Sequence, residues 1–237
     1  MKKIIVTGGT GRFGKILKEY ESKYKLFFPT KAQLDIMSLK SIKNYIKKIK
    51  PNYLIHLAGL SRPMKLHNND ICKSIDLNII GTANITKSCA EKNIKLIYFS
   101  TNYVYQGSKG NYSEKDPVFP VNNYAWSKLG GESSVHLYKN SLILRVSMTE
   151  KPFVHKKAFS NVKTSFLYHE DVAKIIFKLI GKRGIINVGG NTKSIYEFAK
   201  QDNYFVKKIL LKKKSNNEIP VNSSLNITKL KKILNKK

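Results

Sequence analysis

With 237 residues, of which 41% are hydrophobic, the chain is long enough to bury a substantial core as one α/β domain with a small appendage. Its two cysteines exclude a disulfide-stabilised scaffold and favour a reducing compartment. No apolar run reaches the length that crosses a membrane, and the apolar run after Lys3 is too short for a signal peptide. We therefore expect a cytoplasmic protein without a membrane span.

The charge is strongly positive, because 44 lysines and arginines stand against 15 aspartates and glutamates, which gives a net charge of +29. Taken alone, this balance suggests a protein that binds nucleic acid or a membrane surface. The lysines are spread over most expected helices, which instead favours a compositional bias and no specific nucleic-acid partner. The densest clusters lie at 207–208, 212–214 and 229–237. Such a field should still attract anionic ligands, including nucleotides.

The N-terminal stretch has the order strand, glycine turn, helix. A short apolar run at 4–6 leads directly into glycines, and an apolar pattern of helical period follows over 12–20. In this context Gly8 permits a tight turn, Gly11 lets the backbone approach a pyrophosphate, and Gly14 lets the helix pack closely on the strand. The amides and the dipole of the helix then favour the phosphates. The stretch predicts a dinucleotide-binding turn.

The residues after the expected second strand, 25–28, bear on the type of cofactor. In dinucleotide folds an acid often follows this strand and binds the ribose hydroxyls, whereas a basic residue accommodates a 2′-phosphate. Here Lys31 comes first, and the nearest acid is Asp35, which could cap the next turn or reach the adenine. The sequence therefore favours NADPH over NAD.

Strand and helix patterns alternate through the rest of the chain. A helix over 39–49 is expected to start from Ser38 as its N-cap, and His56 is expected to be a hydrogen-bonded core histidine. The other expected elements are strands over 53–57, 95–100 and 184–190, helices over 74–92, 171–179 and 194–200, and a basic helix over 227–234 that docks on its own domain. This alternation predicts an α/β fold with a doubly wound parallel sheet.

Reactive side chains are expected at the rim of that sheet. Ser100 and Thr101 come where a buried strand ends, and Tyr124 and Lys128 are four residues apart on an expected helix. Residues at this spacing share a helix face, so the ammonium can lie near the phenol. A nearby cation stabilises a phenolate and lowers its pKa, which would make Tyr124 a proton donor or acceptor.

These motifs, in this order, resemble those of the extended, sugar-nucleotide branch of the short-chain dehydrogenase/reductase superfamily. The segments 100–107, 144–147 and 221–226 are similar to the dTDP-4-dehydrorhamnose reductase family, and the resemblance covers nearly the whole chain. It implies a Rossmann domain over 1–147 and a shortened substrate-binding region over 148–237, interleaved with the last strands and helices of the core. It also implies NADPH-dependent reduction of a 4-keto group on a nucleotide-linked deoxysugar, in polysaccharide biosynthesis.

The resemblance implies roles for individual residues. Thr101 would hydrogen-bond the substrate carbonyl, Tyr124 would exchange the proton, and Lys128 would bind the nicotinamide ribose and lower the tyrosine pKa. Asn78 would help to hold the lysine and a proton-relay water. The expected cofactor contacts are Gly8, Gly11, Arg12, Phe13, Gly14, Lys31, Asp35, Ala58, Gly59, Ser100, Tyr124 and Lys128, and the expected substrate contacts are Asn102, Arg145 and Lys156. No metal site is expected.

Three features depart from the family pattern. The family has an acid where Asn102 stands and an aromatic residue where Met148 stands, and the stretch between Arg145 and 169–173 is shorter than usual. The basic segment 151–157 could replace part of the missing pocket or form a plain surface loop. Its lysines, Lys156 among them, could bind a diphosphate.

Two other functions stay open. One is an NAD-dependent epimerase or dehydratase, although no glutamate follows Thr101 and no separate epimerase domain is present. The other is a non-catalytic regulatory or binding subunit, which would not need Thr101, Tyr124 and Lys128 together. The oligomeric state is also open, with a homodimer as one form.

Overall fold

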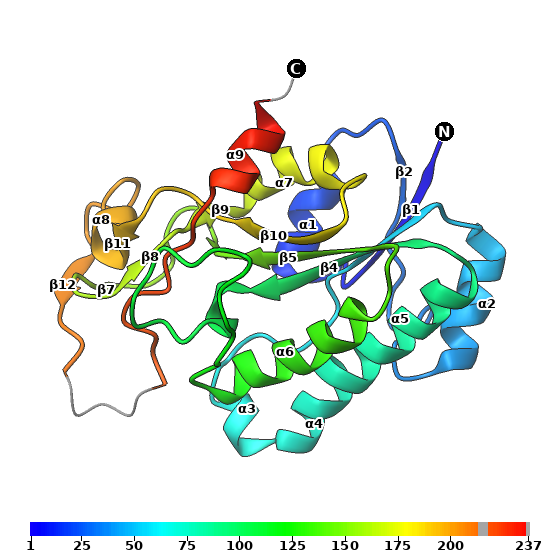
Figure 1. Cartoon of the computed structure of the whole chain (residues 1–237), viewed down its shortest axis with the longest axis horizontal. Coiled ribbons are helices and arrows are strands. Elements are labelled where there is room, and N and C mark those ends of the chain that lie inside the picture. Colours follow the sequence, from blue (N-terminus) through cyan, green and yellow to red (C-terminus); the bar gives the residue numbers. More distant parts are fainter. Residues whose placement is uncertain (213–217, 236–237) are drawn as a thin grey trace.

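The centre of the structure, a computed structural model that describes residues 1–212 and 218–235, is a six-stranded parallel sheet (Figure 1). Its spatial order is β10-β5-β4-β3-β1-β2, and every neighbouring pair is parallel. The strands are β1 (Lys3–Thr7), β2 (Lys25–Phe27), β3 (Tyr53–His56), β4 (Lys95–Thr101), β5 (Ser141–Val146) and β10 (Gly184–Val188). The expected doubly wound parallel sheet is confirmed.

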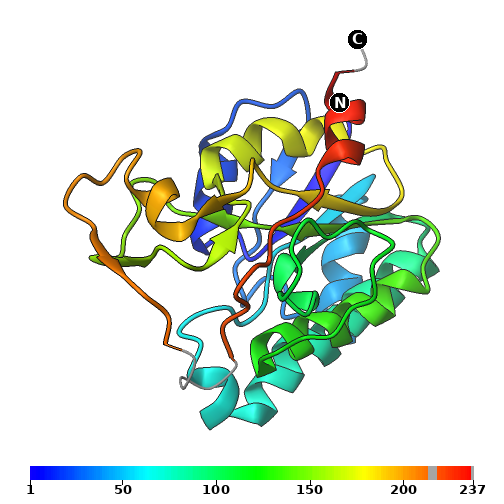
Figure 2. The same ribbon diagram turned by 60° about the vertical axis from the view of Figure 1, so that its left-hand side comes forward.

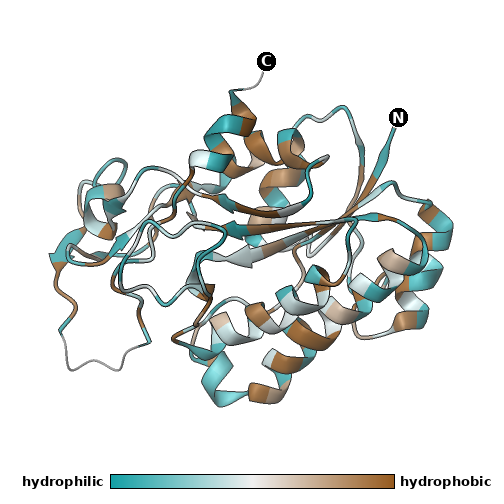
Figure 3. Ribbon diagram, in the orientation of Figure 1, coloured by the Kyte–Doolittle hydropathy of each residue, from teal (hydrophilic) through white to brown (hydrophobic). Residues whose placement is uncertain are grey.

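Helices cover both faces of this sheet (Figure 1). One face carries α1 (Arg12–Glu19), α7 (His169–Leu179) and α9 (Thr228–Leu234), and the other carries α2 (Leu39–Ile49), α5 (Gly81–Glu91) and α6 (Asn123–His136). The helices show apolar and polar stripes side by side, as amphipathic helices do (Figure 3). Their apolar stripes build two core clusters, one on each face of the sheet. Sheet residues such as Ile4, Leu54 and Ile97 are fully buried between them.

The expected helix caps and core histidine are present. The Ser38 hydroxyl accepts a hydrogen bond from the Ser41 amide at 3.2 Å, at the start of α2. Ser194 forms a capping box with Glu197 at the start of α8 (Ile195–Ala199). His56 is buried between the hydroxyls of Thr7 and Thr82 at 2.8 and 3.1 Å, and burial lowers its pKa to about 3. It is therefore a neutral core residue.

The helix expected over 74–92 differs in the structure. It is preceded by α3 (Leu66–Asn69), begins as α4 (Ile71–Ile75), continues through a π-helical segment, η1 (Asp76–Ile80), and ends as α5. A π-helical turn changes the direction of the side chains that it carries, and such turns are frequent at functional sites. Here the π-helical segment contains Asn78.

The segments 148–168 and 193–209 form a small lobe that stands off one end of the sheet (Figure 2), whereas α7, β10 and α9, which also follow β5, belong to the core. A short 3-10 helix, η2 (Asn102–Val104), leads away from β4 before α6. The lobe contains α8 and three short two-stranded pairs, and its strands are β6 (Met148–Thr149), β7 (Lys157–Phe159), β8 (Lys163–Thr164), β9 (Leu167–Tyr168), β11 (Lys193–Ser194) and β12 (Lys207–Ile209).

The chain then returns from the lobe to the core (Figure 2). Helix α9 buries Leu230 against α7 and β10, which confirms that it docks on its own domain. Lys213, Lys214, Lys236 and Lys237, which belong to the basic clusters, lie outside the described residues. Within 1–212 and 218–235, every helix is too short or too polar to cross a membrane.

Candidate active site

The glycine turn lies between β1 and α1, next to the point where the strand order reverses. Strand β1 lies between β2 and β3, so the turn after β1 and the loop after β3 flank a switch point, where open α/β sheets bind ligands. Gly8 has φ +72°, and the Gly11 amide donates to its carbonyl at 2.9 Å. Gly11 is the N-cap of α1 and has no capping side chain, so the first amides of the helix remain donors for an anion.

Close backbone approach requires glycine at this turn. A Cβ at Gly8 would lie 2.6 Å from the Ala58 amide nitrogen, and one at Gly14 would lie 2.5 Å from the Gly8 carbonyl. The structure therefore brings the turn into direct contact with the loop after β3. This geometry fits a pyrophosphate lying over the turn.

Substitution of Gly8 by alanine is expected to abolish dinucleotide binding and to lower the free energy of unfolding by more than the roughly 1–3 kcal/mol that a strained φ alone costs. Two control variants separate backbone strain from steric overlap. Gly184 has φ +77°, but a Cβ there would meet no atom within 4 Å, so Gly184→Ala reports strain alone. Gly181 has neither a positive φ nor a neighbour within 4 Å, so Gly181→Ala reports neither effect. Thermal unfolding should show the largest loss of stability in Gly8→Ala, a smaller loss in Gly184→Ala and the smallest in Gly181→Ala. NADPH titration should show a loss of binding in Gly8→Ala. Equal effects of all three substitutions would contradict this expectation.

The side chain of Asn78 links the loop after β3 to α6 by hydrogen bonds. Its side-chain oxygen accepts from the Leu60 amide at 2.7 Å, and its nitrogen donates to the Leu60 carbonyl at 2.9 Å and to the Ser127 hydroxyl at 2.8 Å. Gly59 lies so close that a Cβ there would be 2.6 Å from the Asn78 oxygen. All three contacts go to the loop after β3 and to Ser127 on α6, and none of them goes to Lys128.

Thr101 and Tyr124 meet at the carboxyl edge of the sheet. Thr101 ends β4, and Tyr124 lies in the first turn of α6, which begins at the N-cap Asn122. Burial raises the pKa of Tyr124 to about 12, while a hydrogen bond with the Thr101 side chain and the charges of Arg62 and Arg12 oppose this shift. The phenol is therefore protonated at neutral pH, as a proton donor must be.

Lys128 lies on the same helix, with its ammonium 4.2 Å from the centre of the Tyr98 ring. Burial lowers the pKa of Lys128 to about 7, and the negative charge of Glu132 opposes the shift. The expectation that Lys128 lowers the pKa of Tyr124 differs from the structure, in which the phenol pKa is raised. The spacing placed both groups on one helix, but burial is the largest influence on the pKa of Tyr124 and raises it.

Substitution of Lys128 by methionine is expected to stabilise the fold. A lysine pKa lowered from 10.5 to about 7 means that the unfolded chain holds the proton more tightly. The cost of burying the charge is thus fully present below pH 7 and disappears as the pH rises towards 10.5. At pH 6 the free energy of unfolding of the variant should be higher than that of the wild type by at most a few kcal/mol, the value that corresponds to the pKa shift of Lys128. Urea unfolding at pH 6 and pH 10 would check this, and a loss of stability at pH 6 would contradict it.

A cavity of about 690 Å³ opens beside Tyr124, between the rim of the sheet and the lobe. Tyr103 and Arg62 line it from the core, while Phe153, Lys156 and Phe166 line it from the lobe. The cavity has the size of a small-molecule site, and its walls combine aromatic rings with cations. Of the three expected substrate contacts, Lys156 lies in its wall.

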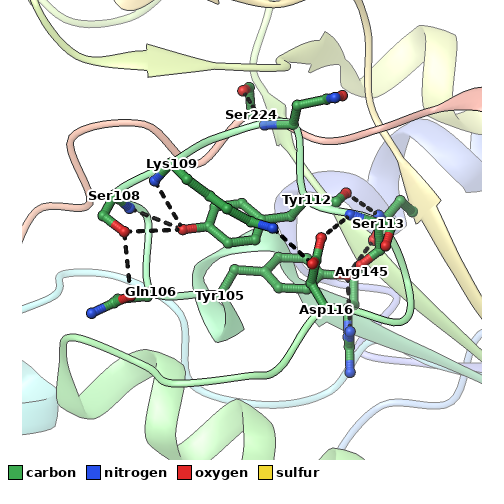
Figure 4. A network of polar contacts seen from close by, with 11 residues as sticks. Tyr105, Gln106, Ser108, Lys109, Tyr112, Ser113, Asp116, Arg145 and Ser224 are labelled. Carbon is green, nitrogen blue, oxygen red and sulfur yellow. Dashed lines mark hydrogen bonds and ion pairs between the residues drawn. The ribbon is translucent and has the colours of Figure 1, made fainter.

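Arg145 and Asn102 lie elsewhere. Arg145 is 4% exposed, and its guanidinium binds the Glu132 carboxylate at 2.6 Å. It also donates to the Tyr105 hydroxyl at 2.9 Å (Figure 4). Asn102 is buried and donates to the carbonyl and the hydroxyl of Ser223. Neither lines the cavity, so the structure gives both a role in holding segments of the core together.

Of the other expected cofactor residues, two lie in the core and two lie after β2. Ser100 is buried and donates to Glu132, and Phe13 is buried against Phe99 with ring centres 5.2 Å apart. Both side chains therefore serve the core. Lys31 is exposed after β2, and the Asp35 carboxylate accepts from the Met37 amide at 3.0 Å, which is the turn-capping alternative.

The sequence did not single out a charge cluster at the mouth of the site. Glu150, which follows β6, pairs with Arg12 at 2.9 Å and with Arg62 at 3.1 Å. Arg12 reaches it from the start of α1 and Arg62 from the loop after β3, so three distant segments meet. The ring of His67, from α3, lies 5.1 Å from the Tyr124 ring and was also missed. No local motif marks Glu150, Arg62 or His67, because their partners are remote in the chain, whereas Arg12 was expected as a cofactor contact and is instead seen paired with Glu150.

Comparison with known proteins gives matches to one family and to solved structures of the same fold. Residues 1–179 match the model of the family described as RmlD substrate binding domain. Over 98% of this chain and 92% of the other, the structure is similar to that of dTDP-4-dehydrorhamnose reductase from Bacillus anthracis in complex with NADP, with a TM-score of 0.85 and 25% identity.

Two curated relatives match shorter stretches. Methionine adenosyltransferase 2 subunit beta from Xenopus tropicalis is 30% identical over 61% of this chain and 46% of its own length. GDP-6-deoxy-D-talose 4-dehydrogenase from Aggregatibacter actinomycetemcomitans is 32% identical over 58% of this chain and 48% of its own length. The matched region of this chain thus spans about half the length of these curated relatives.

Proposed function

The chain belongs to the RmlD substrate-binding domain family, and we propose that it is an NADPH-dependent reductase of a 4-keto group on a nucleotide-linked deoxysugar. The observation that carries this proposal is the meeting of Thr101 and Tyr124 at the carboxyl edge of the sheet, beside a cavity of about 690 Å³. The resemblance to the family, first drawn from the sequence, is confirmed by the match over 1–179.

In the proposed reaction the residues at the rim orient the ketone and handle the proton. When bound, NADPH supplies the hydride. The Thr101 hydroxyl holds the carbonyl oxygen, and Tyr124, protonated because its pKa is about 12, donates its proton to the oxygen that becomes the alcohol. Lys128 and the α6 segment, fixed by Asn78 through Ser127, hold the ribose side of the site. Lys156 and Arg62 in the cavity wall bind the diphosphate.

Three features support NADPH as the cofactor. The glycine turn and the uncapped start of α1 suit a pyrophosphate, and Lys31 rather than an acid follows β2. The similar structure from Bacillus anthracis was solved with NADP. We further propose that 1–147 form the cofactor-binding domain, and that 148–237 form a shortened substrate-binding region interleaved with the last strands and helices of the core. Thr101, Tyr124 and Arg62 add substrate contacts from the cofactor-binding domain.

The test is an assay of the purified protein with NADPH and a panel of nucleotide-linked 4-keto-deoxysugars. Net, stoichiometric oxidation of NADPH with formation of the alcohol is the expected result. Sugar turnover without net cofactor oxidation would contradict the reductase proposal and point to an epimerase or dehydratase that recycles its NAD.

The likeness to methionine adenosyltransferase 2 subunit beta supports a second candidate, a non-catalytic subunit. This candidate predicts that cofactor and sugar nucleotide bind without turnover, and that Tyr124→Phe has no functional effect. The proposed reductase instead requires activity that disappears with the Tyr124 hydroxyl. Parallel measurement of binding and turnover on the same preparations separates the two.

A further inference from the structure

A second cavity lies at the opposite, amino-terminal edge of the sheet, where Figure 1 marks the N-terminus. It measures about 310 Å³ and is lined by the cations Lys2, Lys95 and Arg183 and by the amides of Asn52, Asn93 and Asn140. Among the residues that the structure describes, no aspartate or glutamate belongs to its lining. Because β1, β3 and β4 are parallel, the cavity is separated from the glycine turn by the length of the strands.

Lys95 is the unusual residue of this cavity. It is 6% exposed, and its ammonium donates to the Ser141 carbonyl at 3.2 Å. Lysines are almost never fully buried without a charged partner, because removing the ammonium from water is costly. Among residues 1–212 and 218–235, no acid forms an ion pair with Lys95. Burial and the charge of Arg183 lower the pKa of Lys95 to about 8.

Hydrogen bonds position Lys2 and the three asparagines of the lining, while Arg183 is exposed. The Lys2 ammonium donates to the Tyr53 hydroxyl at 3.3 Å. The Asn52 side-chain oxygen accepts from the Lys3 amide at 2.9 Å, which leaves its N–H groups as donors, and the Asn140 amide donates to the Asn93 side chain at 3.3 Å. Three cations and several amide donors thus surround one space without a compensating negative charge.

We propose that this cavity binds a small phosphate-bearing anion, held by Lys95 and Arg183 with Lys2 at its entrance. The anion would neutralise the positive charges of the lining, and the side-chain amides would donate hydrogen bonds to its oxygens. Its volume lies at the small end of the range for ligand sites, so the ligand is inorganic phosphate or a small phosphomonoester. The site is independent of the proposed reductase activity.

The test uses the whole protein with NADP present in excess, so that the glycine turn is occupied in every sample. Thermal unfolding and calorimetric titration are measured with inorganic phosphate and with AMP, each against sodium chloride of equal ionic strength. Both ligands probe the same phosphate chemistry. A larger effect of one over the other identifies inorganic phosphate or a phosphomonoester as the source.

Lys95→Met and Arg183→Gln are the test variants, and Lys182→Gln, an exposed neighbour outside the lining, is the matched control. Methionine at position 95 removes a buried charge and keeps an unbranched stem, so this variant should fold. We expect phosphate or AMP to raise the unfolding temperature of the wild type and of Lys182→Gln, and the apparent dissociation constant to rise at least tenfold in both test variants. Equal responses in all four proteins, or a response no larger than with chloride, would overturn the proposal.

Discussion

Replacement of Tyr124 by phenylalanine is expected to lower kcat for ketosugar reduction by about 10²–10⁴-fold, the range that positioned general acids contribute. The phenol lies against Thr101 at the rim of the sheet, and its raised pKa keeps the proton available at neutral pH. Phenylalanine keeps the ring and its packing against His67 but removes the only acidic proton of the side chain. Steady-state kinetics with NADPH and the ketosugar would check this.

Binding measurements distinguish a loss of proton transfer in Tyr124→Phe from a loss of cofactor binding or of folding. The phenylalanine variant should bind NADPH within about threefold of the wild type and unfold at a similar temperature, since no core contact of the ring is lost. Ser127→Ala, which removes a hydroxyl that bonds to Asn78 on the same helix, is a matched control with an expected smaller loss. Retained activity in Tyr124→Phe would assign proton transfer to another group.

Replacement of Arg145 by methionine is expected to lower the free energy of unfolding by about 3–5 kcal/mol, the cost of leaving one partner of a buried ion pair uncompensated. Arg145 is 4% exposed, and its guanidinium links β5 to Glu132 on α6. It also donates to the Tyr105 hydroxyl (Figure 4). Urea denaturation would measure the loss. A residue that bound substrate would instead raise KM and leave unfolding unchanged.

Two further variants isolate the buried pair. Arg145→Met combined with Glu132→Leu removes both charges, so it should recover a large part of the lost stability. Lys174→Met breaks an exposed pair with Asp171 and should cost less than about 1 kcal/mol. An equal loss in Arg145→Met and Lys174→Met would contradict the structural role of Arg145.

The sequence was sufficient to predict features that depend on local spacing. The glycine turn, the Ser38 and Ser194 caps, five of the six parallel strands and the docking of α9 follow from periodicity and capping chemistry within short windows, whereas the buried strand β5 was not predicted. Tyr124 and Thr101 were also singled out as site candidates, because each lies at the boundary of a strongly patterned element. In the structure the end of β4 and the first turn of α6 bring their side chains within hydrogen-bonding reach.

Features that depend on remote partners were not predictable in this way. Arg145 and Asn102 lie in recognisable motifs, but only the fold shows that Glu132 and Ser223 take their hydrogen bonds. Glu150 joins Arg12 and Arg62 across more than 80 residues of sequence, so no local pattern marks it. The pKa of Tyr124 depends on burial, which a helix wheel does not give.

The most direct test of the proposed reaction follows the hydride itself. The protein is incubated with NADPH that carries deuterium at the transferable position of the nicotinamide, together with a nucleotide-linked 4-keto-deoxysugar, and the product is analysed by mass spectrometry. The account predicts one deuterium on C4 of the sugar for each NADPH oxidised, and a rate of deuterium transfer that is lowered by about 10²–10⁴-fold in Tyr124→Phe. A sugar product without deuterium, or a cofactor that keeps its label while the sugar turns over, would contradict it.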